Sequence, residues 1–371
     1  MHSLVRFSVA AARESRLIRQ IRKLSRTIVV DGQPLRAISV YMVREGDRWR
    51  LDDADDTGYE GVACVDDAAR AATLFLEAWR RFKLAPACEE AQGYLRFVLY
   101  MQQPDGRFAN FILNWKGDQN LTGPTSVPHG PNWNARALRA LALAAVATDD
   151  HRYREAFDRA LPQVTKSRQY ADIRALHVLA ALELYEQTRE AALRRHIVSW
   201  CDEIAGLRDD KGRLLNWAHE YRPHLWGYVQ PAALARASVA LKRSDWLRLA
   251  EETVSRFLAS RVRAAFPHTT VIAYEVSSVV ADLKILAEVT GNHRYRELLF
   301  LARAWFRGRN AASQPVYDTV QGTVSDGIDD GQLNPNSGAE SNIEGALALI
   351  DELPWGLYYA GKQKPSAERS P

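Results

Sequence analysis

Two adjacent acidic residues, Asp66 and Asp67, stand at the start of an apolar segment, EGVACVDDAARAATLF at 60–75. A carboxylate at the start of a helix can accept hydrogen bonds from the free N–H groups of the first turn, and the helix dipole favours its charge. Two consecutive aspartates cannot both occupy one cap position, so capping explains only one of them. Paired carboxyl groups can instead do acid–base chemistry, in which one gives a proton and the other acts as a base or nucleophile.

Polar and aromatic residues also stand where five further apolar helices are predicted to begin. These groups are Asn132–Trp133–Asn134, Tyr170 with Asp172, Tyr228 with Gln230, Tyr274 with Glu275, and Glu340–Ser341–Asn342. Capping does not require the aromatic residues among them. Carboxylates and amides together with flat aromatic faces suit a sugar, whose hydroxyls take the hydrogen bonds while its apolar ring face stacks on Trp or Tyr.

The elements that must position these residues are helices. Helical periodicity predicts helices at about 13–27, 66–83, 86–103, 131–148, 151–167, 170–188, 190–207, 228–243, 244–262, 275–290, 293–308 and 340–352. Every second one, beginning with 66–83, is rich in small residues and apolar nearly all round, which is typical of a helix buried on all sides. The others carry charge on one face and should lie outside. The pattern predicts an all-α fold, an (α/α)6 toroid of six helical hairpins whose inner helices begin at one mouth.

An internal repeat supports this plan. The segments GRFANF at 106–111 and GRLLNW at 212–217 share Gly, Arg and Asn and end on an aromatic residue, and each leads through a polar loop into an inner helix. The segments 38–59 and 314–338 are long loops rich in Asp, Gly and Asn, and loops of such length are often functional. We expect one domain over 1–362 and a disordered tail at 363–371.

The alternating helix pairs, the acidic and aromatic residues at the inner helix mouths and the DGRF-type turns resemble the six-hairpin superfamily of carbohydrate-active proteins. That superfamily includes glycoside hydrolases, unsaturated-uronide hydrolases and N-acylglucosamine 2-epimerase-like proteins. VDDAARA at 65–71 and SGAESNIEGALAL at 337–349 also resemble stretches of helical toroid domains found beside bacterial glycosyltransferases. The architectural likeness covers nearly the whole chain, whereas the motifs cover a short part of it.

The resemblance implies two carboxyl groups across a glycosidic bond, about 5–5.5 Å apart in a retaining enzyme and about 6.5–9.5 Å apart in an inverting one. Asp66, Asp67 and Glu340 are the first candidates, because the first and last inner helices should close the ring side by side. Glu275 is the next candidate. Because Asp66 and Asp67 are neighbours, we expect only one to face the mouth and the other to cap the helix or hold Arg70.

The expected substrate-binding residues come from the same helix starts and from the repeated turns. They are Asn110, Trp133, Asn134, Arg136, Asp172, Trp217, Tyr228, Gln230, Tyr274, Asn342 and Glu344. Glu344 lies one turn beyond Glu340 and can bind substrate or raise the pKa of Glu340 by like-charge repulsion. Arg136 and Arg174 can hold an acidic sugar, or form internal ion pairs that fix neighbouring helices. An unpaired Arg136 or Arg174 in the cavity would indicate a charged glycan.

Composition and motifs argue against several other classes. The net charge of +4 on 371 residues, with no basic cluster interleaved with aromatics, disfavours nucleic acid. No apolar run is long enough for a membrane span, and the segment around Phe7–Ala12 is too short for a secretory signal. Three widely spaced cysteines indicate neither a disulfide framework nor a zinc knuckle, and fit the cytoplasm.

Four weaker motifs are set aside in favour of a protein without metal or cofactor. GLYYAGK at 356–362 lacks the Ser or Thr that follows the lysine in a phosphate-binding loop. DDADD at 52–56 lies in a loop rather than on a helix. SDGIDDGQ at 325–332 lacks the spacing of a calcium-binding hand. His219 and His224 stand five apart with Pro223 between them, which is not helical ligand spacing.

The sequence therefore predicts a cytoplasmic glycoside hydrolase that acts on an oligo- or polysaccharide, with a carbohydrate as its partner. The resemblance also implies a place beside a glycosyltransferase. Two other readings stay open. An epimerase, isomerase or lyase would use a His or Tyr base, for which Tyr170, Tyr274 and His177 are available. A non-catalytic module that binds a glycan or a partner is the third, since a fold does not fix a function.

Overall fold

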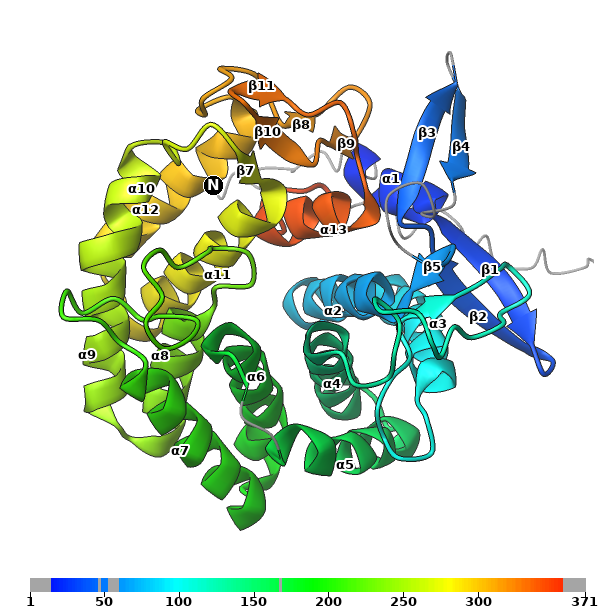
Figure 1. Cartoon of the computed structure of the whole chain (residues 1–371), viewed down its shortest axis with the longest axis horizontal. Helices are drawn as coiled ribbons and strands as arrows, with labels where there is room; N and C mark the ends of the chain where they lie inside the picture. Colours follow the sequence, from blue (N-terminus) through cyan, green and yellow to red (C-terminus); the bar gives the residue numbers. More distant parts are fainter. Residues whose placement is uncertain (1–14, 46–47, 53–59, 167–168, 356–371) are drawn as a thin grey trace, which may run out of the picture.

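The inner ring of the protein consists of six helices that surround a common axis, seen end-on in a computed structural model of the chain (Figure 1). The structure describes residues 15–45, 48–52, 60–166 and 169–355. The inner helices are α2 (Val65–Phe82), α4 (Pro131–Ala147), α6 (Ala171–Thr188), α8 (Gln230–Leu241), α11 (Ala273–Thr290) and α13 (Ala339–Ala348). Each packs against the next, and α13 closes the ring against α2. The predicted (α/α)6 toroid is confirmed.

An outer helix packs against each inner one. The outer helices are α1 (Arg16–Leu24), α3 (Ala85–Met101), α5 (His151–Thr165), α7 (Ala191–Gly206), α9 (Ser244–Thr253) and α12 (His293–Arg303). A π-helical turn at Val254–Leu258 carries α9 into the short α10 (Ala259–Arg263), and a 3-10 turn at Ala304–Arg307 extends α12.

The burial patterns of the two rings explain the alternation in the sequence. In α6 every residue from Ala171 to Tyr185 is buried, because helices or loops cover it on all sides. In α5 the buried residues lie on one face of the helix, at Tyr153, Ala156, Phe157, Ala160 and Val164, and the opposite face lies in water. An all-round apolar helix belongs in the inner ring and a one-sided helix belongs outside.

Short strands occur between the helices and were not predicted. Two hairpins precede the first inner helix, β1 (Ser25–Val30) with β2 (Gln33–Ile38), and β3 (Tyr41–Glu45) with β4 (Arg48–Asp52). The predicted helix over 13–27 therefore extends too far, because Ser25–Thr27 belong to β1. The β-branched run at 27–30 favours a strand, and Asp31 and Gly32, both at positive φ, make the hairpin turn.

The remaining strands tie loops to the starts of inner helices. β5 (Ala63–Cys64) pairs with β6 (Phe111–Ile112) directly before α2, and β7 (Val271–Ile272) pairs with β10 (Gly327–Asp329) directly before α11. β10 also pairs with β11 (Gln332–Leu333), and β8 (Tyr317–Asp318) pairs with β9 (Thr323–Val324). The loop at 314–338 is thus a set of small hairpins at the mouth of the ring.

Several sequence predictions lie outside the described residues. They are the disordered tail at 363–371, GLYYAGK at 356–362 and most of DDADD at 52–56. Within the described ranges, none of the helices combines the length and apolar character that crossing a bilayer requires. Cys64, Cys88 and Cys201 are free thiols.

Candidate active site

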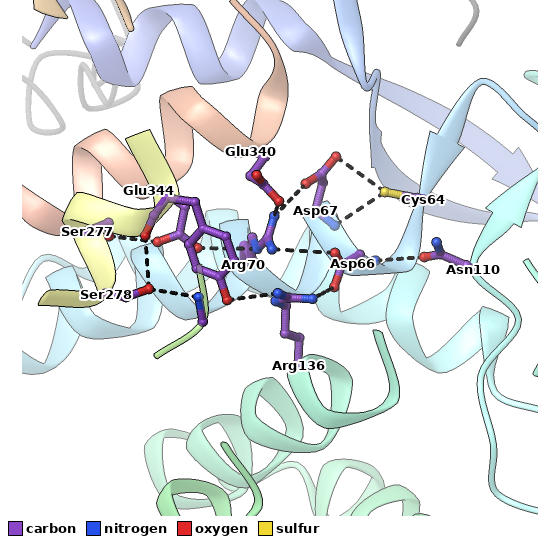
Figure 2. A network of polar contacts seen from close by, with 12 residues as sticks. Cys64, Asp66, Asp67, Arg70, Asn110, Arg136, Ser277, Ser278, Glu340 and Glu344 are labelled. Carbon is purple, nitrogen blue, oxygen red and sulfur yellow. Dashed lines mark hydrogen bonds and ion pairs between the residues drawn. The ribbon is translucent and has the colours of Figure 1, made fainter. Parts of the chain in front are cut away.

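The first turn of α2 carries the two aspartates, and other residues cap that helix. The N-cap is Cys64, whose Sγ accepts a hydrogen bond from Asp67 N at 3.4 Å. Asn110 Oδ1 accepts one from Asp66 N at 3.2 Å. Capping therefore does not account for either aspartate, and their carboxylates are available for other contacts (Figure 2).

The same holds at the other inner helices. None of the N-cap residues of α4, α6, α8, α11 and α13 makes a side-chain capping bond. By contrast Ser15, Asp150 and Asn292 cap the outer helices α1, α5 and α12. The polar residues at the inner helix starts therefore sit within the first turns, where their side chains serve contacts between elements.

Arg70 is the centre of the site. Its side chain is only 4% exposed, and its guanidinium lies among four carboxylates (Figure 2). Arg70 Nη2 is 3.6 Å from Asp66 Oδ2, and Arg70 Nη1 is 3.5 Å from Asp67 Oδ1 and also bonds Glu340 Oε2. Arg70 Nε lies 3.3 Å from Glu344 Oε1. This cluster joins α2 to α13, so Glu340 lies beside Asp66 and Asp67, which are far from it in the sequence, where the ring closes.

Arg136 and Tyr274 complete the cluster from α4 and α11. Arg136 Nη1 donates to Asp66 Oδ1 at 2.7 Å, and Arg136 Nη2 donates to Tyr274 Oη at 2.8 Å. The guanidinium carbons of Arg70 and Arg136 lie 4.6 and 5.3 Å from the centre of the Tyr274 ring, in cation–π range. Glu344 accepts a hydrogen bond from Ser277 Oγ at 2.7 Å.

Both arginines that could signal a charged glycan are paired. Arg136 bonds Asp66, and Arg174 Nε bonds Glu203 Oε2 at 2.8 Å. Each arginine therefore forms an internal ion pair with a neighbouring helix. Of the two roles left open by the sequence, binding an acidic sugar or fixing neighbouring helices, the contacts agree with the second.

A cavity of about 220 Å³ lies at the mouth, above the cluster. Its acidic lining consists of Asp66, Asp67, Asp326 and Glu340, and Cys64, Asn110, Ser341 and Tyr41 also border it. Both aspartates line this one cavity, so the expectation that only one of them faces the mouth is wrong. The cavity lies over the end of α2 rather than along one side, so two successive positions of the first turn border it.

A second cavity of about 170 Å³ lies deeper inside the ring. Arg70, Arg136, Tyr274 and Glu344 line its upper end, and the ion-pair residues Arg80, Arg236 and Lys284 line its lower part. Arg70, Arg136 and Tyr274 therefore line the inner cavity, at the end where the two arginines bind Asp66.

The two aspartates have opposite pKa shifts. Burial raises the pKa of Asp67, and the neighbouring charges of Asp66 and Glu340 add to this, so that its pKa is about 7 despite Arg70. Burial acts on Asp66 as well, but Arg136 and Arg70 outweigh it and lower its pKa. At near-neutral pH Asp66 is therefore ionised, whereas a large share of Asp67 holds a proton. Adjacent groups with separated pKa values can act as base or nucleophile and as acid.

Two other predicted acidic residues lie elsewhere. Glu275 lies in the first turn of α11, but it faces the backbone N–H of Leu225 and the charge of Arg261, and burial raises its pKa. It lines neither of the two cavities. Asp172 is 3% exposed, burial raises its pKa to about 6, and its Oδ1 has no hydrogen-bond partner.

Five of the predicted substrate-binding residues hold the scaffold together. Asn134 donates to Gly130 O and Pro128 O and accepts from Phe108 N. Asn342 repeats this pattern with Gly338 O, Ser337 Oγ and Val324 N. Trp133 Nε1 donates to Phe108 O, Tyr228 Oη to Leu214 O, and Gln230 Nε2 to Asn216 Oδ1. None of these five lines either cavity.

Three residues of the site were not predicted from the sequence. Cys64 contacts Asp67, and Ser277 donates a hydrogen bond to Glu344. Asp326 lines the mouth cavity. No sequence signal distinguishes Cys64 or Ser277 from ordinary core residues. Asp326 Oδ1 accepts from Gly338 N at 2.8 Å, and Asp330 and Gly331 form the turn between β10 and β11, so SDGIDDGQ builds hairpins. In the described part of the chain, no cluster of His, Cys, Asp and Glu suits a metal ion.

Comparison with known proteins identifies the fold but no close relative. No protein-family profile matches the sequence, and no curated protein sequence does. Among solved structures, a sugar epimerase from a ruminal bacterium matches with a TM-score of 0.65 and 11% identity, over 92% of this chain and 97% of the other. A family 76 α-mannanase of Bacteroides thetaiotaomicron matches with a TM-score of 0.59 and 14% identity, over 84% and 91%.

A third structure is an inactive variant of an α-1,6-mannanase of Salegentibacter in complex with α-1,6-mannotriose. It matches with a TM-score of 0.59 and 10% identity, over 92% of this chain and 98% of the other. In that variant two consecutive aspartates are replaced by asparagine. At these identities the likeness shows the fold, and the chain has the (α/α)6 toroid that glycosidases and sugar epimerases share.

Proposed function

We propose that this chain is a glycoside hydrolase that uses Asp66 as the nucleophile and Asp67 as the general acid. The observation that supports this most directly is the pair itself: two adjacent carboxyl groups with opposite pKa shifts, lining one open cavity. The mannanase variant in which two consecutive aspartates are replaced by asparagine is inactive, and the pair at the start of α2 has the same consecutive arrangement. We therefore propose an α-1,6-linked mannan as the first substrate to test.

The reaction would take place in two steps. The Asp66 carboxylate attacks the anomeric carbon while the glycosidic C–O bond breaks, and the Asp67 carboxyl group gives its proton to the departing oxygen. The Asp67 carboxylate then takes a proton from water, whose oxygen attacks the same carbon and releases Asp66. Arg136 and Arg70 keep Asp66 ionised before the attack.

Glu340 has a different proposed role. It bonds Arg70 through one oxygen, yet its side chain is 40% exposed and borders the mouth cavity. Its free oxygen can accept a hydrogen bond from a sugar hydroxyl. Glu344, buried between Arg70 and Ser277, positions Arg70 rather than touching substrate.

A sugar epimerase is the second candidate, because a sugar epimerase shares the fold over nearly its whole length. An epimerase needs a base beside the sugar, but no histidine lines either cavity in the described residues. His177 is buried between Arg174 and Trp200, and burial lowers its pKa to about 3. The carboxylate lining favours hydrolysis.

The test is an assay of purified protein on α-1,6-mannotriose, mannan and a panel of other oligosaccharides, with products separated so that shortened chains and isomerised sugars are distinguished. Hydrolysis by the wild type, lost in Asp66→Asn and Asp67→Asn, is the expected result. Asp282→Asn is the matched control, because Asp282 is a buried acid on α11 that bonds Ala232 N at 2.8 Å and lines neither cavity. Isomerised products, or unchanged hydrolysis in both variants, would refute the proposal.

The comparisons give no support to the expected place beside a glycosyltransferase. The cytoplasm stays our proposed location, on the strength of the three free cysteines. One domain over 1–362 likewise stays a proposal.

A further inference from the structure

Four aromatic side chains follow one another on the surface beside the site. The rings of Tyr170 and Trp217 are 5.6 Å apart, those of Trp217 and His224 are 5.7 Å apart, and those of His224 and Trp226 stack at 3.7 Å. We call these four residues the aromatic ladder. Tyr170, Trp217 and Trp226 are 56%, 42% and 37% exposed. A contiguous row of exposed rings is unusual on a soluble protein surface and indicates a binding role.

The backbone holds the ladder in place. Tyr170 is the N-cap of α6, and the other three rings lie on the loop between α7 and α8. In that loop, Asn216 Nδ2 donates to His224 O at 3.2 Å, and His224 Nδ1 contacts Trp226 O at 3.1 Å. Gly227 N donates to Ser278 Oγ on α11 at 3.0 Å. The rings are therefore pre-organised, which reduces the entropic cost of binding a ligand to them.

The ladder begins at the catalytic cluster. Gly227, next to Trp226, lies so close to the site that a Cβ placed on it would be 2.9 Å from Tyr274 Oη and 3.8 Å from Asp172 Oδ2. Its φ of +73° also favours glycine. Tyr274 Oη in turn is bonded by Arg136, the residue that holds Asp66.

Asp172 lies at this junction with an unused acceptor. Its Oδ1 is buried and lacks a hydrogen-bond donor. A buried polar atom without a partner is costly and calls for an explanation. The other oxygen of this carboxyl group, Oδ2, lies beside Gly227 at the end of the ladder, so a hydroxyl group bound there can donate to Asp172.

We propose that Asp172 and the aromatic ladder form successive sugar subsites, so that the substrate is a chain of several units that runs from the mouth cavity over Gly227 to Tyr170. This inference rests on the proposed function, because it takes the occupant to be a glycan. The cavity of about 220 Å³ is smaller than the roughly 300–1,000 Å³ of a site for a drug-sized ligand, so a longer sugar chain needs a further surface. Exposed rings accept the apolar faces of further units, and Asp172 takes a hydroxyl.

The test measures affinity, so that it does not depend on turnover. Isothermal titration calorimetry uses α-1,6-linked manno-oligosaccharides of two to six units, with gluco- and xylo-oligosaccharides of the same lengths, against the Asp66→Asn protein. We expect affinity to rise with chain length for one series. Trp217→Ala and Trp226→Ala should each weaken binding of the hexasaccharide about three- to tenfold, with little change for the disaccharide. Asp172→Asn should weaken binding of the trisaccharide and longer chains.

The matched control is Tyr221→Ala. Tyr221 is 80% exposed on the same loop, but its ring packs on Arg222 and on no ring of the ladder. This variant should bind every length as the parent does. Equal losses for short and long chains, an equal loss in the control, or no length-dependent binding in any series would overturn the proposal.

The outcome separates the ladder from the hydrolase proposal. In one outcome the protein binds long chains more tightly than short ones, loses this preference in the two Trp variants, and shows no hydrolytic activity. That result would support the ladder and refute hydrolysis. Hydrolysis whose KM for long chains is unchanged in both Trp variants would support hydrolysis and refute the ladder.

Discussion

If Asp67 is the general acid, as proposed, Cys64 should control the pH at which the hydrolytic activity is lost. Its Sγ lies 3.3 Å from Asp67 Oδ2, and burial raises the pKa of the thiol well above its usual value, so the group stays an S–H donor. A donor to a carboxylate favours the ionised form and lowers its pKa. Cys64→Ala removes the donor and should raise the pKa of Asp67. Cys64→Ser supplies a stronger O–H donor and should lower it.

The size of the effect follows from the pKa of Asp67, which is about 7. At pH 8 roughly one tenth of Asp67 is protonated. A shift of about half a pKa unit, or about 0.7 kcal/mol, raises this to roughly one quarter in Cys64→Ala and lowers it to roughly 3% in Cys64→Ser. We therefore expect kcat/KM at pH 8 to rise about 2.5-fold in the first variant and to fall about threefold in the second.

The assay is the pH profile of kcat/KM, which reports the ionisations of the free enzyme. Below about pH 6 the three proteins should have nearly equal values, because most of Asp67 is then protonated in each. Cys88→Ser, on α3 and remote from Asp67, is the control and should leave the profile unchanged. Cys64 also caps α2, so thermal unfolding of each variant establishes that the protein is folded at every pH. If the alkaline limb of the pH profile shifted in the same direction in Cys64→Ala and in Cys64→Ser, the role of Asp67 as the general acid would be refuted.

The remaining predictions concern stability and stereochemistry. The folded pKa of Asp67 lies above the unfolded value of about 3.9, so the stability it contributes is full below about pH 4 and is lost as pH rises through about 7. The amide side chain introduced in the Asp67→Asn variant does not titrate. Between pH 4 and pH 8 the free energy of unfolding of Asp67→Asn, measured in urea, should therefore rise relative to that of the wild type by up to about 4 kcal/mol. The same difference between the two proteins at pH 4 and at pH 8 would contradict this. Asn134→Ala and Asn342→Ala should each lower the free energy of unfolding by about 2–3 kcal/mol and change KM by less than about twofold, because each amide bonds only scaffold groups. A large rise in KM without a loss of stability would instead show that these residues bind substrate. Because the proposed attack by Asp66 forms a covalent intermediate that water then opens, proton NMR of the first product should show a retained anomeric configuration, and an inverted one would exclude Asp66 as the nucleophile.

The ring architecture could be predicted because inner and outer helices bury their surfaces differently. The segment that forms α6 is apolar on all sides and can only lie inside, whereas α5 has a single apolar face. The hairpin of β1 and β2 was not predicted. The helical spacing of the basic residues in the helix before it continues into the first residues of β1, so the predicted helix included them. Its β-branched run and its Asp31–Gly32 turn were the signals that would have placed it.

The candidate site could be predicted in part. Closure of the ring brings Glu340 to Asp66 and Asp67, since the first and last inner helices must be neighbours. Two features were out of reach. Asn342 has the residue type of a sugar ligand, and only the hydrogen bonds to Val324 N and Gly338 O show that it ties a loop.

The direction of a first-turn side chain was equally out of reach. Glu275 and Asp67 both stand near helix starts, yet one faces Leu225 and Arg261 and the other faces the mouth. The difference depends on the loop that covers each helix end, and helix periodicity carries no information about that loop.

The most direct test of the central claim is to separate the roles of Asp66 and Asp67 by the leaving group. The measurement compares the cleavage of an α-1,6-linked oligosaccharide with that of a dinitrophenyl glycoside of the same sugar, whose phenolate leaves without a proton. Asp67→Ala should lose the first reaction by a factor of at least about 100 and keep the bond-breaking step of the second, whereas Asp66→Ala should lose both. Equal losses of both substrates in Asp67→Ala, or full activity in Asp66→Ala, would contradict the assignment.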